Sequence, residues 1–531
     1  MQKRKYFSDK WWWVGFLVEF VLLCGSIVDA SVHDYRGEGF IPQSNSFFLH
    51  GGSEGLFASK VHDVKDNPSS DDRSLKGKSF IRFDSVTFVR TKAATDSVDE
   101  MQRNAGLVEA IIVEEKDRDR IGGSFWKSNL ICCTKDLSKL SNCKTGEVII
   151  HQNQDKPEWP KRIQTFFNGN DEEVTMDPHT VEIDAAGMYN LYFVFCDRKL
   201  NGTIIRGRTV WRNPGGYLPG KMAPLMTFFG SMSLAYLALG LVWFIRFVQL
   251  WEYTSQLHNY IAAVIALGMF EMSIWYFEYA NFNSTGSRPM GITFWAVTFT
   301  CIKKTVSRLL LLVVSMGYGV VKPTLGGMTS KVLLLGLIYF IASEALELFE
   351  HLGNINDLSG KTKLFLALPV TFLDAWFILW IFSSLSATLE KLQTRRSAAK
   401  LGLYRKFTNS LAIFVLLSIA WVGYELYFNA SDPSNELWQI AWIIPAFWTL
   451  LSYSLLLVIC VLWAPSHNPT RYAYSEETGG DSDEEGISLT SSGVSVGGDV
   501  TSKLERKERK GPSVTDHGYG TGDDLEEDKQ E

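Results

Sequence analysis

Seven apolar stretches follow one another in the second half of the chain. Each is long enough to cross a hydrocarbon core of about 30 Å, which takes roughly 20 apolar residues in a helix. The stretches lie near residues 223–245, 257–280, 291–320, 331–352, 363–388, 409–428 and 437–463. This pattern predicts a bundle of seven transmembrane helices in a membrane domain of residues 221–465.

The third stretch is unusual because it carries two lysines, Lys303 and Lys304, near its middle. A charge at the bilayer centre costs about 2.5–3.5 kcal/mol on insertion scales, so both should face a polar surface inside the bundle. Counting from the span ends places Glu271, Glu344 and Asp374 at a similar depth, as candidate counter-charges. The full set of expected intramembrane polar residues is Glu271, Glu278, Lys303, Lys304, Arg308, Glu344, Glu347 and Asp374.

Two interpretations of these residues stay open. They form ion pairs that only fix the register of the helices, or they line a lumen-open, water-filled cavity for a lipid, a peptide or an ion. We favour the cavity, because ionisable residues inside a membrane commonly mark functional sites. A conducting pore is the weaker hypothesis, since no selectivity-filter sequence or repeated ring of charges is visible.

The first 30 residues resemble a secretory signal peptide. A basic segment precedes an apolar run at residues 11–27, and Val28 and Ala30 supply the small residues of a cleavage site. An uncleaved signal anchor is the alternative.

Residues 31–220 contain several short strand-like runs with turn signals and no long amphipathic helix, which predicts an exported all-β sandwich. In the strongest run, residues 188–196, four side chains share one face by the period-two rule: Tyr189, Leu191, Phe193 and Phe195. Asn201 and Gly202 then predict a hairpin turn into a strand over residues 203–211.

Cysteine usage agrees with export, because the exported segment holds an even number of cysteines. Neighbours Cys132 and Cys133 are unsuited to pair with each other. Each is expected to pair with one of Cys143 and Cys196, and both arrangements remain open. We expect no metal site, because the four lack a pair of CxxC knuckles.

Charge and sequons indicate the orientation. The loop at residues 390–406 is rich in lysine and arginine, so the positive-inside rule places it in the cytosol. The N-glycosylation sequons at Asn201, Asn283 and Asn429 then all face the lumen. The tail, residues 466–531, is expected to be a disordered, acidic cytosolic segment that binds sorting adaptors, with Ser482 as a phosphorylation site.

The sequence lacks the signature motifs of several classes of function. The chain has no H-E-x-x-H, G-x-S-x-G or Walker sequence, so we expect no enzyme, no catalytic residues and no cofactor. It also has no basic tract with interleaved aromatic residues, so we expect no nucleic-acid partner.

Motifs in the membrane half resemble a known family. They are GYLPGKMAPLM (216–226), SRLL (307–310), MGYGVVKP (316–323), LDAWFILWIFSS (373–384), LYRKFTN (403–409) and LWAPSHN (462–468). Together they are similar to the lung seven-transmembrane receptor family, and the last two to its transmembrane protein 87 branch.

The resemblance implies a Golgi-dynamics (GOLD) sandwich, matched by GMYNLYF at 187–193, above a seven-helix domain with a lumen-facing cavity. It implies residence in Golgi and endosomal membranes and a role in protein trafficking, including endosome-to-Golgi retrieval. The expected partners are membrane lipids, lumenal cargo proteins that are membrane-bound or secreted, and cytosolic sorting adaptors. The alternatives are a Golgi cation channel and a G-protein-coupled-receptor-like protein at the plasma membrane.

Overall fold

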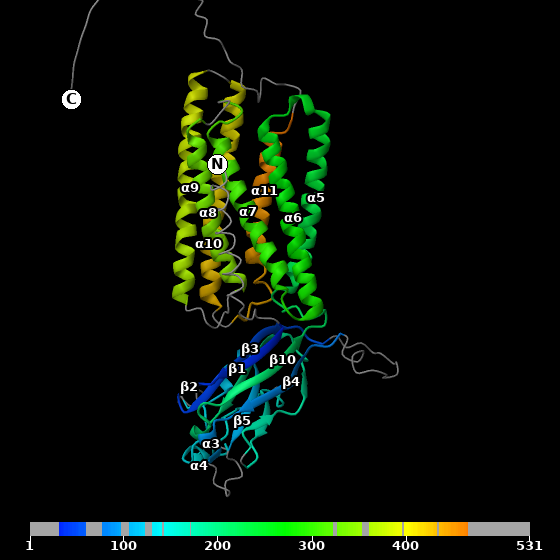
Figure 1. Cartoon of the computed structure of the whole chain (residues 1–531), viewed down its shortest axis with the longest axis vertical. Helices are drawn as coiled ribbons and strands as arrows, with labels where there is room; N and C mark the ends of the chain where they lie inside the picture. The colour runs from blue at the N-terminus through cyan, green and yellow to red at the C-terminus, as the bar shows by residue number, and fades with distance from the viewer. Residues whose placement is uncertain are drawn as a thin grey trace, which may run out of the picture. The chain divides into compact units, whose positions relative to one another are not determined.

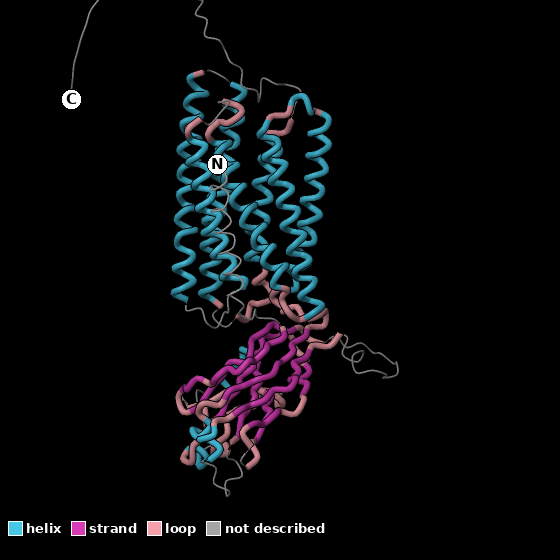
Figure 2. The backbone as a smooth tube through the Cα atoms, viewed as in Figure 1, coloured by secondary structure: helices cyan, strands magenta, loops and turns pink. Residues whose placement is uncertain are grey.

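The computed structural model shows an N-terminal β-sandwich followed by a long helical region (Figures 1 and 2). The described residues are 31–59, 77–96, 106–122, 130–140, 143–154, 156–169, 171–321, 326–352, 360–395, 398–432 and 435–465. The predicted fold class, a membrane protein with a β-sandwich before its transmembrane helices, is confirmed. The predicted signal peptide (1–30) and the acidic tail (466–531), with Ser482, lie outside the described residues.

Two antiparallel sheets form the sandwich. The strands are β1 (Val32–Gly39), β2 (Ile41–Gln43), β3 (Ser46–Leu56), β4 (Phe80–Val89), β5 (Leu107–Glu114), β6 (Lys161–Phe166), β7 (Glu173–Thr175), β8 (His179–Glu182), β9 (Gly187–Phe195) and β10 (Ile204–Arg212). One sheet has the order β1-β10-β4-β7, with β8 also paired to β4, and the other has the order β2-β3-β9-β5-β6.

Strand β9 is buried on both faces. Tyr189, Leu191 and Phe193 point into the core between the sheets, as the alternation predicted. Tyr192 and Val194 on the opposite face belong to a second, smaller apolar cluster that also contains Val148. A strand with both faces covered occupies the centre of its sheet, between β3 and β5.

The predicted hairpin at Asn201 and Gly202 is wrong. Strand β9 lies in one sheet and β10 in the other, so the turn carries the chain across the sandwich. A short 3-10 helix, η3 (Arg198–Leu200), follows β9, and its Leu200 side chain is buried in the core between the sheets. This buried leucine and the helical turn direct the chain away from β9 before the second strand begins.

The structure resolves the open cysteine pairing. Cys132 bonds Cys196 at the end of β9, and Cys133 bonds Cys143. The segment that carries Cys132 and Cys133 is also held by the side chain of Asn45, whose Oδ1 accepts hydrogen bonds from the backbone N–H groups of Ile131 (2.8 Å) and Cys132 (3.1 Å).

Glu109 on β5 is a buried carboxylate with a pH-dependent contribution to stability. Burial raises the pKa of its carboxyl above the ordinary value of 4.5, although Arg162 (3.4 Å) and the Val148 N–H (2.6 Å) favour the charged form. Because the folded-state pKa is the higher one, this contribution is fully present below the unfolded-state pKa and is lost as pH rises through the folded-state pKa.

We therefore expect the thermal stability of the full-length protein to fall less steeply between mildly acidic and neutral pH in Glu109→Gln than in the natural protein. Glutamine keeps the shape of the side chain and does not titrate. Melting curves of the β-sandwich in the full-length protein, recorded by limited proteolysis at a series of pH values from 5 upward, measure the difference. Parallel pH profiles of the two proteins would contradict this assignment.

The helical region contains seven long helices among the described residues. They are α5 (Ala223–Gln249), α6 (Gln256–Thr285), α7 (Met290–Ser315), α8 (Met328–Leu352), α9 (Gly360–Thr394), α10 (Ala398–Ser431) and α11 (Ile443–Leu462). All except α7 contain a long, strongly apolar window suited to crossing a membrane. Helix α7 is continuous, but its apolar sequence is interrupted by three basic residues: Lys303, Lys304 and Arg308.

Several helix boundaries differ from the ends of the predicted spans, and two of the helix starts show why. Helix α10 begins at Ala398, about three turns before the predicted residue 409, because the basic segment there continues as helix beyond the apolar stretch. Helix α11 begins at Ile443 rather than near residue 437, because turns occupy the residues before it.

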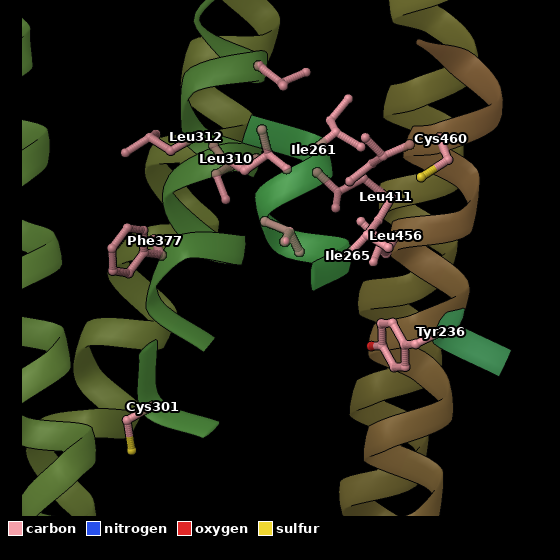
Figure 3. Packing of buried hydrophobic residues seen from close by; sticks show 14 of the residues in the cluster. Tyr236, Ile261, Ile265, Cys301, Leu310, Leu312, Phe377, Leu411, Leu456 and Cys460 are labelled. Atoms are coloured by element: carbon pink, nitrogen blue, oxygen red, sulfur yellow. The ribbon is translucent and has the colours of Figure 1, made fainter. Parts of the chain in front are cut away.

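The core of the bundle forms around α7, which packs against α6, α8 and α9. Figure 3 shows buried side chains from several helices of this core. Gly268 on α6 lets the ring of Tyr236 on α5 pack directly against the α6 backbone, because a Cβ atom at this position would lie 2.2 Å from that ring. The Tyr236 side chain is fully buried at this contact.

Candidate functional site

Each basic residue of α7 meets a carboxylate on a different neighbouring helix. Lys303 lies 2.8 Å from Glu271 on α6, and Lys304 forms an ion pair with Glu347 on α8. Arg308 Nε lies 2.6 Å from Asp374 Oδ1 on α9. Adjacent residues of a helix point about 100° apart, so Lys303 and Lys304 necessarily face different neighbours.

The Lys303–Glu271 pair is buried. The side chains are 7% and 5% exposed, and the Lys303 ammonium also lies 5.6 Å from the centroid of the Tyr236 ring. A desolvated pair of this kind is costly to form but much more costly to break, because the remaining charge has no partner. This pair therefore fixes the contact of α7 with α5 and α6.

The pairs of Lys304 and Arg308 are more open. The Lys304 side chain is 38% exposed and its partner Glu347 is 15% exposed, whereas Arg308 and Asp374 are 29% and 32% exposed. The Arg308 guanidinium lies over the ring of Tyr339 on α8, 4.6 Å from its centroid, and donates a hydrogen bond to the Lys304 carbonyl (3.3 Å). Lys304 and Arg308 thus share one accessible face of α7.

A further ion pair involves Arg288, which the sequence analysis missed. Arg288 precedes α7, and its Nε lies 3.1 Å from Glu278 Oε1. The Glu278 side chain is fully buried, and Thr293 donates a hydrogen bond to it (3.1 Å). The signal that could have revealed the pair is a basic residue at the start of the third span, opposite an acidic residue near the end of the second.

Glu344 on α8 differs from the other expected carboxylates. Among the described residues no basic side chain lies within ion-pair distance of it, and Thr298 on α7 donates a hydrogen bond to its Oε1 (2.8 Å). Of the three carboxylates expected opposite the lysine pair, only Glu271 contacts a lysine. Glu347 takes the place expected for Glu344, one turn along α8, and its second partner is His351 (3.7 Å).

The three sequon asparagines occupy different surroundings. Asn201 is exposed at the end of η3, and Asn429 is exposed in the last turn of α10. Asn283, in the last turn of α6, accepts a hydrogen bond from the Leu218 N–H (3.1 Å) and donates one to the Gly215 carbonyl (3.1 Å). Glycosylation at these sites stays a prediction.

The buried and open ion pairs on one helix define a polar site inside a seven-helix membrane domain. Residues 224–470 match the family model described as GOST, seven transmembrane domain, which agrees with the seven helices described above.

Curated relatives with strong similarity to the chain are transmembrane proteins 87, the branch that the motifs resemble. The chain is 36% identical to transmembrane protein 87A of Xenopus tropicalis over 269 residues, and this alignment covers 50% of this chain and 48% of the relative. It is 36% identical over 262 residues to transmembrane protein 87B of Mus musculus, which covers 49% and 46%. The chain spans about half the length of these curated relatives.

A more distant similarity extends over more of the chain. An uncharacterized protein of Schizosaccharomyces pombe is 25% identical over 409 residues, which covers 73% of this chain and 77% of that protein. Membrane protein PTM1 of Saccharomyces cerevisiae is 23% identical over 304 residues, which covers 54% and 56%.

Proposed function

We propose that the protein is a trafficking factor of Golgi and endosomal membranes, with a lumenal GOLD-like sandwich and a cytosolic C-terminus. Its seven-helix domain holds a lipid, or part of a membrane cargo, at the open face of α7. The acidic tail then connects this binding to cytosolic sorting adaptors. Endosome-to-Golgi retrieval is the transport step that we assign to it.

The observation that carries the proposal is the unequal exposure of the ion pairs on α7. A buried pair such as Lys303–Glu271 needs only a structural explanation. The Lys304–Glu347 and Arg308–Asp374 pairs are partly exposed within membrane-spanning helices, where contact with hydrocarbon is unfavourable. Water or a polar headgroup at this face would satisfy their remaining hydrogen-bonding capacity.

Cysteine accessibility tests the cavity. We expect Lys304→Cys to react with a water-soluble methanethiosulfonate reagent on the order of tenfold faster than Lys303→Cys, because burial in apolar surroundings suppresses thiolate formation. Cys301 and Cys460, which are both buried, are replaced by alanine in the background protein. Equal rates at the two neighbouring positions would contradict the distinction between a buried and a water-accessible face of α7. Reagent applied from the lumenal side alone tests the orientation.

The trafficking role needs a cellular test. Loss of the protein should displace Golgi glycoproteins and endosome-to-Golgi retrieval cargo, and the natural chain should restore them. A variant with Arg308→Ala and Asp374→Ala removes one open pair without leaving either charge behind, and we expect it to fold but to restore transport poorly. Gly423→Ala on α10, where a Cβ would meet no atom within 4 Å, is the matched control. Normal cargo distribution without the protein would refute the proposal.

A cation channel is the second candidate, and the length of the polar series along α7 favours it. The series runs from Thr293, which contacts Glu278, to Arg308, a distance of about 22 Å along the helix. Purified protein in liposomes should then conduct cations, with a conductance altered by Lys304→Ala and by Glu271→Gln. Silent bilayers containing folded protein would remove this candidate.

A further inference from the structure

An apolar groove lies on the outer side of the bundle between α5 and α6, away from the ion pairs of α7. Its volume is about 380 Å³, within the usual range of small-molecule sites. Helices α5 and α6 are neighbours over much of their length (Figure 1). We propose that this groove is a binding site for a membrane sterol, a ligand independent of the proposed transport function.

The shape of the groove follows from the residue sizes on the two helices. Gly240 on α5, and Ala262 and Ala266 one turn apart on α6, supply little side-chain volume and leave a hollow between the helices. The aromatic rings of Phe244 and Phe247 form a wall beside it. Small residues normally let transmembrane helices pack closely. Here they lie beside large aromatic side chains instead, and a preformed space results.

The surroundings of the groove determine the class of ligand. Several of its lining side chains are strongly exposed: Leu237, Leu241 and Phe244 on the apolar, membrane-spanning helix α5, and Trp251 just beyond the end of that helix. The medium that covers this face is therefore the bilayer, and the occupant is a lipid. A flexible acyl chain loses conformational freedom when it enters a fixed hollow, whereas a rigid ring system loses little.

Trp243 supplies a polar group that favours a sterol over a hydrocarbon chain. It lines the groove and is 6% exposed, and its indole N–H has no acceptor among the described residues. A buried donor without a partner is unfavourable, and indole N–H groups usually find one. The indole N–H is itself buried, so the ring would turn it toward the groove, where the single hydroxyl of a sterol would accept this hydrogen bond while the sterol rings lie against Phe244 and Phe247.

A filling substitution can close the groove with little strain on the protein. The nearest atom to a Cβ at Gly240 is Ile265 Cγ2 at 3.5 Å, an ordinary contact distance. Gly240→Leu therefore places its added atoms in the groove. Gly423→Leu on α10 is the matched control, because it adds the same atoms in open space on another apolar helix.

Photolabelling of the full-length protein in sterol-containing membranes tests the proposal. The probe is a sterol with a ring diazirine, an alkyne and a free hydroxyl, and labelled peptides are identified by mass spectrometry. We expect labelling of α5 and α6 peptides that excess unlabelled sterol suppresses, that Gly240→Leu abolishes and that Gly423→Leu preserves. Trp243→Phe should weaken labelling by about two- to tenfold, the loss expected for one hydrogen bond.

Three outcomes would overturn the sterol assignment. One is unchanged labelling of Gly240→Leu, and another is sterol labelling elsewhere in the chain only. The third is saturable labelling of the same peptides by a diacyl phospholipid with an acyl-chain diazirine that sterol does not displace. Equal melting temperatures of the two leucine variants and the natural protein show that the comparison is made on folded molecules.

Discussion

Replacing Lys303 by methionine should destabilise the helix bundle by about 3–5 kcal/mol, because it leaves the Glu271 carboxylate buried without its partner. Glu271→Leu should cost a similar amount, because it leaves the lysine ammonium in the same position. The double variant Lys303→Met/Glu271→Leu should recover most of the loss, since an apolar pair fills the space without an unpaired charge. Unfolding of the purified protein in mixed detergent micelles, followed by tryptophan fluorescence, measures all three.

The matched control for this cycle is the neighbouring residue. Lys304→Met should cost clearly less than Lys303→Met, because Lys304 is 38% exposed and its partner Glu347 is less deeply buried than Glu271. Glu347 also retains His351 nearby. If the losses in Lys303→Met and Glu271→Leu simply add in the double variant, the two residues do not act as a pair. Equal losses for Lys303→Met and Lys304→Met would remove the distinction between the buried and the open site.

Removing the Cys132–Cys196 disulfide by serine substitution of both cysteines should cost about 4 kcal/mol, against about 3 kcal/mol for the Cys133–Cys143 disulfide. The first bond joins residues 64 positions apart and the second joins residues 10 positions apart. In the chain-entropy model the longer loop restricts the unfolded chain more. The first bond also connects the central strand β9 to the segment that covers one of its faces.

Protease resistance of the sandwich in the full-length protein, measured against denaturant, gives this comparison. The two double-serine variants serve as controls for each other, because each removes two sulfur atoms and adds two hydroxyl groups. A larger loss for the Cys133–Cys143 bond would show that local packing, rather than loop length, governs the contribution of these disulfides.

The two kinds of ion pair assign different roles to one helix. The buried side of α7 holds the bundle together through Lys303 and its carboxylate on α6. The open side presents Lys304 and Arg308 to a space that a ligand can reach in our proposal. A variant that alters transport without lowering stability should therefore come from the open side.

The sequence by itself determined the architecture and most of the charged residues at the site. Alternating apolar residues such as Leu191 and Phe193 placed one face of β9 in the core, because a strand has a period of two. The length of the apolar stretches identified six of the helices. The seventh, α7, was recognisable despite Lys303, Lys304 and Arg308. These features depend on local periodicity and on the cost of exposing polar groups to hydrocarbon.

Only the tertiary structure decided which groups meet. Helix geometry requires Lys303 and Lys304 to point about 100° apart, but it does not say which helix lies in either direction. The assignments of Glu347 to Lys304 and of Asp374 to Arg308, and the pairing of Cys132 with Cys196, depend on how distant segments pack. Burial, which separates the structural lysine from the accessible one, is likewise a property of the packed bundle, because neighbouring helices exclude water from one side of α7 and not from the other.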